Sequence, residues 1–317
     1  MKPHTAALSA AALLALVFAS TRLMAATPAA LLASGQVDAV IAQLSPAKDA
    51  AGHSLLCRAF YSEEHIDEAV HECEAAANAA PASSEYQRWL ARVYGAKAEH
   101  VGKLSAFGLA KKIHAAMERA VQLDPHSADA LSDLGDYDVD APGMVGGGLD
   151  KANDIAQRLL AVNAARGHRL LARIAEKQGN TAQAEKEYTA AATGAHAAAG
   201  YVDLALFYQS HGSKQQVLSA VKSAVAADSA RDYSIADAAG VLVESHQETR
   251  LAGQLYRSYL DGPSRSDDAP ACRVYLQLGQ LLAANGDTAA AQKAYAASLA
   301  LAKNYAPAQH GASGSRR

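Results

Sequence analysis

Apolar residues recur with a helical period along most of this chain. Residues 165–196 read ARGHRLLARIAEKQGNTAQAEKEYTAAATGAH, in which two helix-period apolar stretches flank a glycine. The stretch that begins at Ala198 repeats this arrangement, and so does CRVYLQLGQLLAANGDTAAAQKAYAASLALA near the C-terminus. Strand signals, meaning alternating runs of Val, Ile, Thr and aromatic residues, are nearly absent. The pattern therefore predicts an all-α chain of helix pairs that recur about every 34 residues.

The copies share a set of fixed positions. The first helix holds a large residue, then Leu and a small residue, then an aromatic one, and the second helix holds Ala, an aromatic residue and Ala after a turn glycine. In the last copy these residues are Tyr275, Leu278, Gly279, Leu282, Gly286, Ala291, Tyr295 and Ser298. This pattern resembles the tetratricopeptide repeat (TPR) family, and in particular exported bacterial TPR proteins of unassigned role.

The resemblance implies a right-handed superhelical solenoid. A single repeat cannot bury its own apolar face, so repeats must stack. We expect about six to seven repeats over residues 27–310, with insertions between paired helices near 95–112 and 138–148. We expect residues 311–317 to form a disordered tail.

The second insertion contains DYDVDAPGMVGGGLDKA, residues 136–152. It lacks the Gly-Lys-Ser/Thr of a phosphate loop, and a helix rather than a strand precedes it. Asp136, Asp138 and Asp140 have the spacing that opens a calcium loop, but the later glycine and glutamate of such a loop are missing. Because Pro142 disfavours helical angles in the residue before it, we predict an elongated turn between two helices. A ligand-binding role for this turn stays open.

The N-terminus has the pattern of a signal peptide. Lys2 precedes the apolar run at 6–19, and small residues near Ala25 offer a cleavage site. We expect residues 1–25 to be removed and the protein to be periplasmic or secreted, with an uncleaved membrane anchor as the alternative. No later segment is apolar enough to cross a membrane.

Export would place the three cysteines in an oxidising compartment. The repeat register puts Cys57 on the first helix of a unit and Cys73 on the second, at positions that the resemblance implies pack together. We expect a disulfide between them, with two buried thiols as the alternative. A metal site with His71 is disfavoured, because His71 and Cys73 face different ways on a helix. Cys272 has no evident partner.

Composition and motifs narrow the function. The net charge is −3 and no basic stripe is present, which argues against nucleic-acid binding. The motifs H-E-x-x-H and G-x-S-x-G are absent, and S-x-x-K matches lack their companion motifs. We therefore predict that the protein is not an enzyme and needs no metal or cofactor.

The TPR register also indicates which side chains face the concave groove. The candidate partner-binding residues are Arg58, Tyr61, Arg88, Arg92, Asp129, Asp136, Arg166, Arg169 and Arg173. The arginines could hold carboxylates of a peptide through paired hydrogen bonds. Alternatively, Asp129 and Asp136 neutralise arginines of neighbouring repeats.

The resemblance thus implies a non-catalytic scaffold or adaptor that binds a protein or peptide, with acidic groups on the partner. The alternative is a periplasmic solute-binding accessory of a transporter, in which the insertions close a small pocket walled by Phe107, Tyr137 and Met144. Exposed arginines in an open groove would favour the scaffold, and an enclosed pocket would favour the accessory. The partner and the oligomeric state do not follow from the sequence.

Overall fold

The computed structural model describes residues 26–193 and 197–314, and within these ranges the chain forms helices and no strand. This confirms the all-α prediction. The predicted signal peptide, residues 1–25, lies outside the described residues. The helices are α1 Pro28–Ala33, α2 Val37–Leu44, α3 Ala50–Ser62, α4 Ile66–Ala79, α5 Ser84–Glu99, α6 Lys103–Leu123, α7 Ala128–Asp140, the 3-10 helix η1 Gly143–Val145, α8 Leu149–Val162, α9 Ala164–Lys177, α10 Thr181–Ala191, α11 Ala197–His211, α12 Lys214–Ala227, α13 Tyr233–Glu244, α14 Thr249–Leu260, α15 Ala271–Ala284, α16 Thr288–Leu301 and α17 Ala306–Gly314.

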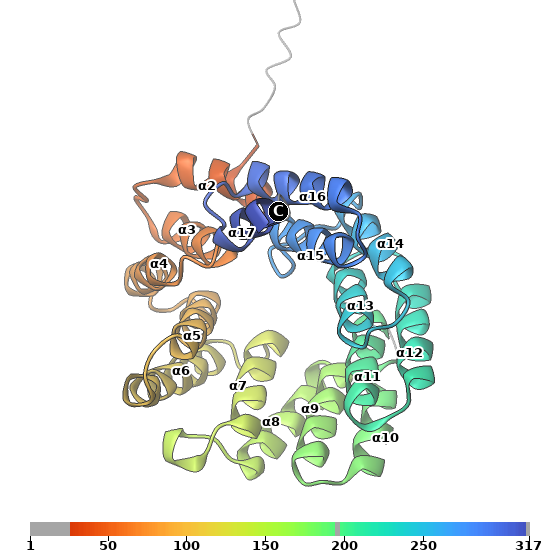
Figure 1. Ribbon diagram of the computed structural model, residues 1–317. Helices are drawn as coiled ribbons and strands as arrows, with labels where there is room; N and C mark the ends of the chain where they lie inside the picture. The colour runs from red at the N-terminus through yellow and green to blue at the C-terminus, as the bar shows by residue number, and fades with distance from the viewer. Residues whose placement is uncertain (1–25, 194–196, 315–317) are drawn as a thin grey trace, which may run out of the picture.

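Consecutive helices pack in pairs, from α3 with α4 to α15 with α16. The odd-numbered helices of these pairs form the inner wall and the even-numbered helices the outer wall (Figure 1). The predicted motif positions lie at the contacts between helices: Ala172 and Ala205, at the small position, are fully buried, and Tyr188 and Tyr295 are buried. Small residues allow neighbouring helices to approach closely, and aromatic rings fill the remaining space.

Side chains at the inner-helix N-termini fix where these helices begin. Ser83 accepts a hydrogen bond from the backbone N–H of Tyr86, Ser127 from that of Ala130 and Asn163 from that of Arg166. Such N-caps satisfy backbone donors that the helix leaves unpaired. They set the register of α5, α7 and α9, and hence the side chains that these helices direct inward.

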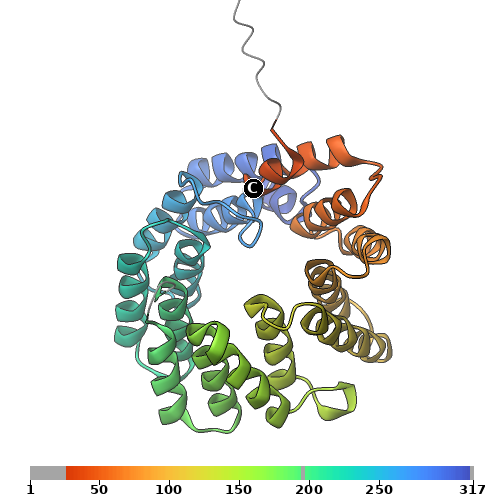
Figure 2. The ribbon, with the colours of Figure 1, turned by 180° about the vertical axis from the view of Figure 1, so that it is seen from behind.

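The stack curves until its two ends meet, so the solenoid is a ring (Figures 1 and 2). Leu32 and Val40 near the N-terminus share a buried apolar cluster with Cys272, Tyr295 and Tyr305 near the C-terminus. We call this junction of α1–α3 with α15–α17 the seam. The expected open superhelix is therefore closed by apolar burial between segments that are far apart in the sequence.

Polar contacts complete the seam. The backbone N–H of Lys303 donates to Asp38 Oδ2 at 2.9 Å, and Arg273 Nε donates to the carbonyl oxygen of Ser62 at 3.2 Å. Gly35 has a φ of +80°, and a Cβ there would lie 2.8 Å from the Cβ of Ala271. Only glycine fits this approach without strain.

The two predicted insertions take different forms. The segment near 95–112 is largely helical: α5 runs to Glu99 and α6 begins at Lys103, so it lengthens two helices. Its Ala, Lys and Leu residues favour helix. In the segment near 138–148, α7 continues to Asp140 and the non-α-helical part is 141–148. Residues 311–314, expected in a disordered tail, belong to α17.

Candidate functional site: the central cavity of the ring

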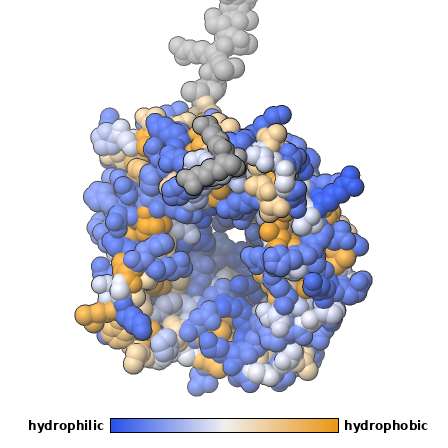
Figure 3. Space-filling model, in the orientation of Figure 1, coloured by the Kyte–Doolittle hydropathy of each residue, from blue (hydrophilic) through white to orange (hydrophobic). Residues whose placement is uncertain are grey.

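The inner helices enclose a central cavity of about 1140 Å³. Figure 3 shows the ring hollowed at its centre, with largely hydrophilic residues around the opening. The wall is built from α3, α5, α7, α9, α11, α13 and α15 and from the loop before α15. This cavity takes the place of the concave groove that the repeat register predicts.

Ion pairs link each inner helix to the next along the N-terminal half of the wall. Arg88 Nε on α5 donates to Asp133 on α7 at 2.8 Å, and Arg169 Nη1 on α9 donates to Asp136 on α7 at 2.9 Å. Arg169 Nε also reaches Asp203 on α11 at 3.3 Å. Further pairs join Asp129 to Arg88 and Arg166, and Arg173 to Asp136 and Asp140.

These ion pairs shift the pKa values of both the acids and the arginines. Burial alone would raise the pKa of Asp129, but Arg166 and Arg88 lower it below its usual range. Burial would likewise lower the pKa of Arg169, yet Asp136 and Asp203 raise it. The arginines are therefore held by carboxylates of the same chain.

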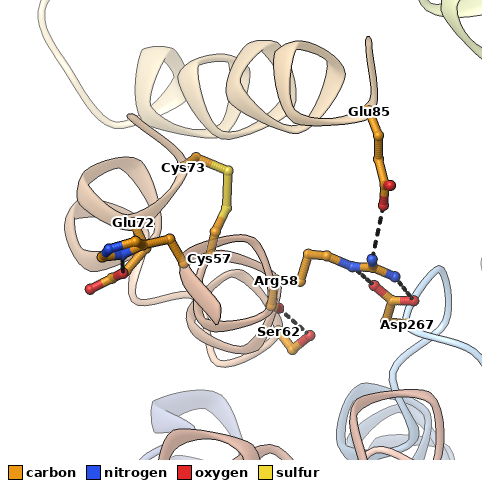
Figure 4. The surroundings of a disulfide bond; sticks show 8 residues. Cys57, Arg58, Ser62, Glu72, Cys73, Glu85 and Asp267 are labelled. Carbon is orange, nitrogen blue, oxygen red and sulfur yellow. Dashed lines mark hydrogen bonds and ion pairs between the residues drawn. A yellow bond between two sulfur atoms is a disulfide. The ribbon is translucent and has the colours of Figure 1, made fainter. Parts of the chain in front are cut away.

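Arg58 extends this chain of ion pairs across the seam. Its guanidinium donates to both carboxylate oxygens of Asp267, at 2.6 and 2.8 Å, and to Glu85 at 3.1 Å (Figure 4). Asp267 lies in the loop between α14 and α15, so this two-point contact ties the N-terminal to the C-terminal part of the ring. Paired hydrogen bonds of this type fix geometry as well as charge.

Trp89 forms an aromatic platform on the same wall. The guanidinium groups of Arg58 and Arg92 lie over its ring, 5.1 and 4.5 Å from the ring centroid, and the ring of Tyr61 packs against it in a T-shaped arrangement. Cation–π contacts of this kind hold both arginines in place. Arg92 Nη1 also lies 3.6 Å from Asp268 Oδ1, in the loop before α15.

The cavity as a whole is acidic. Among the described residues, twelve Asp or Glu side chains and five arginines line it. Asp237 and Glu244, one face of α13, are both exposed to the cavity and form no hydrogen bond or ion pair with any described residue. Burial, together with repulsion from Asp203, Asp232 and Asp268, raises the pKa of Asp237 to about 6.

The predicted groove residues divide into two groups. Arg58, Arg88, Arg92, Asp129, Asp136, Arg166 and Arg169 line the cavity, whereas Tyr61 and Arg173 do not. The cavity arginines are half-buried and paired: the side chain of Arg88 is 18% exposed and that of Arg169 is 30% exposed. Tyr61 belongs to the seam, where the guanidinium of Arg273 stacks on its ring at 4.9 Å.

Several acids of the cavity were not predicted from the sequence, among them Asp203, Asp267 and Asp268. The last two lie in the segment DGPSRSDDAP, whose Gly, Pro and Asp content marks a loop. Tyr259 fixes this loop: its hydroxyl donates to the carbonyl of Ala269 at 2.8 Å and accepts from the N–H of Ser266 at 3.0 Å. No pattern in the sequence indicates that the loop reaches α3.

The residues expected to wall a solute pocket lie elsewhere. Phe107 is 38% exposed and Met144 73% exposed, and neither lines the cavity. The Tyr137 hydroxyl lies 2.8 Å from the carbonyl oxygens of both Ala110 and Val145, so it ties α6 to the following turn. The small pocket predicted for the transporter accessory is not formed by these residues.

The glycine-rich turn packs on α6. Gly146 has a φ of +106°, and a Cβ there would lie 2.6 Å from the ring of His114, so the position requires glycine. Asp138, beneath the turn, is buried, and burial raises its pKa to about 6. Within residues 26–193 and 197–314, no group of three or more His, Cys, Asp or Glu side chains could hold a metal ion. Asp136, one of the three aspartates with calcium-loop spacing, is instead paired with arginines.

Cys57 and Cys73 form a disulfide between α3 and α4, with their Cα atoms 5.2 Å apart (Figure 4). Cys272 is a free, buried thiol. Among the described helices, none combines the length and apolar character needed to span a membrane.

No family model and no curated protein matches the sequence. Solved structures do. Yeast Tom70 matches over 88% of this chain and 58% of its own, with 13% identity and a TM-score of 0.52. The TPR protein TTC0263 of Thermus thermophilus matches over 60% of this chain and 89% of its own, with 14% identity and a TM-score of 0.43.

A chain of the APC/C hetero-tetramer Cut9–Hcn1 matches over 90% of this chain, with 10% identity and a TM-score of 0.41. The present chain spans just over half the length of that protein, 54%, and of Tom70. Identities this low compare folds only. Together with the repeat pattern, the likeness to Tom70 shows that the chain has the fold of the tetratricopeptide-repeat family.

Proposed function

We propose that this protein is an exported, non-catalytic scaffold that binds a segment of a partner protein in the central cavity of the ring. The observation that carries the proposal is the cavity itself. At about 1140 Å³ it exceeds the size typical of small-molecule pockets, about 300–1,000 Å³. Its wall presents side chains from every inner helix, as a surface for an extended segment would.

Export is part of the proposal. It is supported by the apolar N-terminal run after Lys2 and by the Cys57–Cys73 disulfide, since disulfides persist in oxidising compartments. The likeness to Tom70 contributes the fold to this proposal, and no partner of Tom70 is carried over.

Site-specific photo-crosslinking tests the proposal. A photoreactive amino acid replaces Leu206, which is 42% exposed in the cavity, or Val162, which is 38% exposed at the end of outer helix α8. After irradiation in an envelope extract of the source organism, we expect a defined protein adduct from position 206 and none from position 162. Equal adducts from both positions, or none from position 206, would overturn binding in the cavity.

A further inference from the structure

The charge of the cavity is unevenly distributed. The five cavity arginines, on α3, α5 and α9, all have carboxylate partners at the wall, so that side is close to neutral. Most of the cavity carboxylates that form no ion pair with an arginine lie on α13 and in the turn before it: Asp228, Asp232, Asp237 and Glu244. A partner approaching the cavity therefore meets a net negative surface, contrary to the expectation of an arginine-rich groove.

Two of these carboxylates, Asp237 and Glu244, have no partner among the described residues. By contrast, Asp228 and Asp232 accept backbone hydrogen bonds that stabilise the turn before α13. Asp237 and Glu244 accept none from any described residue, and both project from α13 into the cavity. Asp237 is close enough to Asp203 and Asp268 for mutual repulsion, which a cation would relieve.

An exposed apolar side chain lies beside these acids. Leu206, one turn after Asp203 on α11, is 42% exposed inside the cavity, and Val202 and Val241 line the wall near it. Among the described residues that line the cavity, Leu206 is the one large apolar side chain that is exposed, so an apolar group of a ligand would be partly removed from water there. The combination of free carboxylates and an exposed leucine suits a ligand that is both cationic and partly apolar.

From this juxtaposition we infer that the cavity takes a positively charged segment of a partner protein. Its lysine or arginine side chains meet Asp237 and Glu244, and an apolar side chain meets Leu206. This inference rests on the proposed scaffold function and specifies its partner chemistry. The paired arginines around Trp89 shape the opposite wall and are not the recognition groups.

Fluorescence anisotropy tests the inference with two probes. One is a short, flexible, labelled peptide rich in lysine with two leucines, and the other is the same peptide with glutamate in place of each lysine. We expect the lysine peptide to bind the mature protein, with an affinity that falls as salt is added, because partly exposed charges are screened. We expect no binding of the glutamate peptide.

A matched pair of variants locates the binding. Asp237→Asn with Glu244→Gln removes two charges from the cavity, and Glu68→Gln with Asp154→Asn removes two from exposed positions on outer helices α4 and α8. The cavity variant should bind the lysine peptide about tenfold more weakly, or 1.4 kcal/mol. The outer variant should bind like the wild type. Circular dichroism confirms that both are folded.

The outcomes separate this inference from the proposed function. Equal weakening by both variants would show non-specific attraction and overturn the inference. Preference for the glutamate peptide would overturn the cationic partner. So would binding of neither peptide, if the photoreactive amino acid at position 206 still crosslinks a partner protein. Both outcomes leave the scaffold function standing. Absence of a crosslink from position 206 would overturn the scaffold function itself.

Discussion

Reduction of the Cys57–Cys73 disulfide should destabilise the first full repeat. The bond closes a loop with a sequence separation of 16 residues. The loop-closure relation gives a stabilisation of about 3 kcal/mol for such a loop. Both cysteines are fully buried, so the bond also holds α3 against α4 within the apolar core. In a stack of repeats the loss should be local, because each unit contacts only its neighbours.

The single tryptophan of the chain reports on this unit. Trp89 belongs to the same buried cluster as Cys57 and Cys73. Urea unfolding is followed by tryptophan fluorescence for the oxidised protein and for protein held in reductant. We expect the midpoint to move to lower urea by the equivalent of about 3 kcal/mol, with the slope nearly unchanged.

Two controls make this prediction refutable. The variant Cys57→Ala with Cys73→Ala should unfold identically with and without reductant, and Cys272→Ala should retain the full effect of reduction. Coincident unfolding curves for the oxidised and reduced wild type would refute the reasoning. A response to reductant in the double variant would show that the effect does not come from this bond.

Three further predictions concern buried or crowded polar groups. Burial raises the pKa of Glu63, whose carboxylate is fully buried in the seam. Ionisation of this carboxylate therefore destabilises the folded state, and stability falls as pH rises through that pKa. Glu63→Gln should raise the melting temperature at pH 7 and not at pH 4. Burial and neighbouring acids raise the pKa of Asp237 to about 6. Asp237→Asn should therefore stabilise the free protein above pH 6, by up to about 1 kcal/mol because the side chain is partly exposed. For the same reason, the affinity of the wild type for the lysine peptide should fall as the pH drops below 6. Tyr259→Phe leaves Ser266 N–H and the Ala269 carbonyl without this partner and should cost about 1–3 kcal/mol in urea unfolding, whereas a loss near zero would show that water replaces the hydroxyl.

The repeat pattern was sufficient to predict the local fold. Leu278 and Gly279 lie on α15 and Tyr295 on α16, as the register requires, because helical periodicity and turn glycines act over short distances. Pro142 ends α7 as predicted, with Ala141 in an extended conformation. These features depend on neighbours in the sequence and can be recognised there.

The ring and its charge distribution could not be predicted in the same way. The contact between Arg58 and Asp267 joins residues 209 positions apart, and its formation depends on the accumulated curvature of every repeat between them. The same curvature brings Arg92 to Asp268 instead of to a neighbouring repeat. A small change in the angle between repeats would separate Arg58 from Asp267 and Arg92 from Asp268, so these two contacts could not be predicted from the sequence.

Ring closure is the central claim, because the cavity exists only if the ends of the stack meet. Its most direct test is crosslinking of Asp38→Cys with Lys303→Cys in a Cys272→Ala background, using a thiol crosslinker with a reach of a few ångströms. The backbone N–H of Lys303 lies 2.9 Å from Asp38 Oδ2, so we predict a high yield of the internal crosslink, whereas Asp38→Cys with Asp154→Cys should give none. Two freely alkylated thiols at positions 38 and 303 would contradict the closed ring.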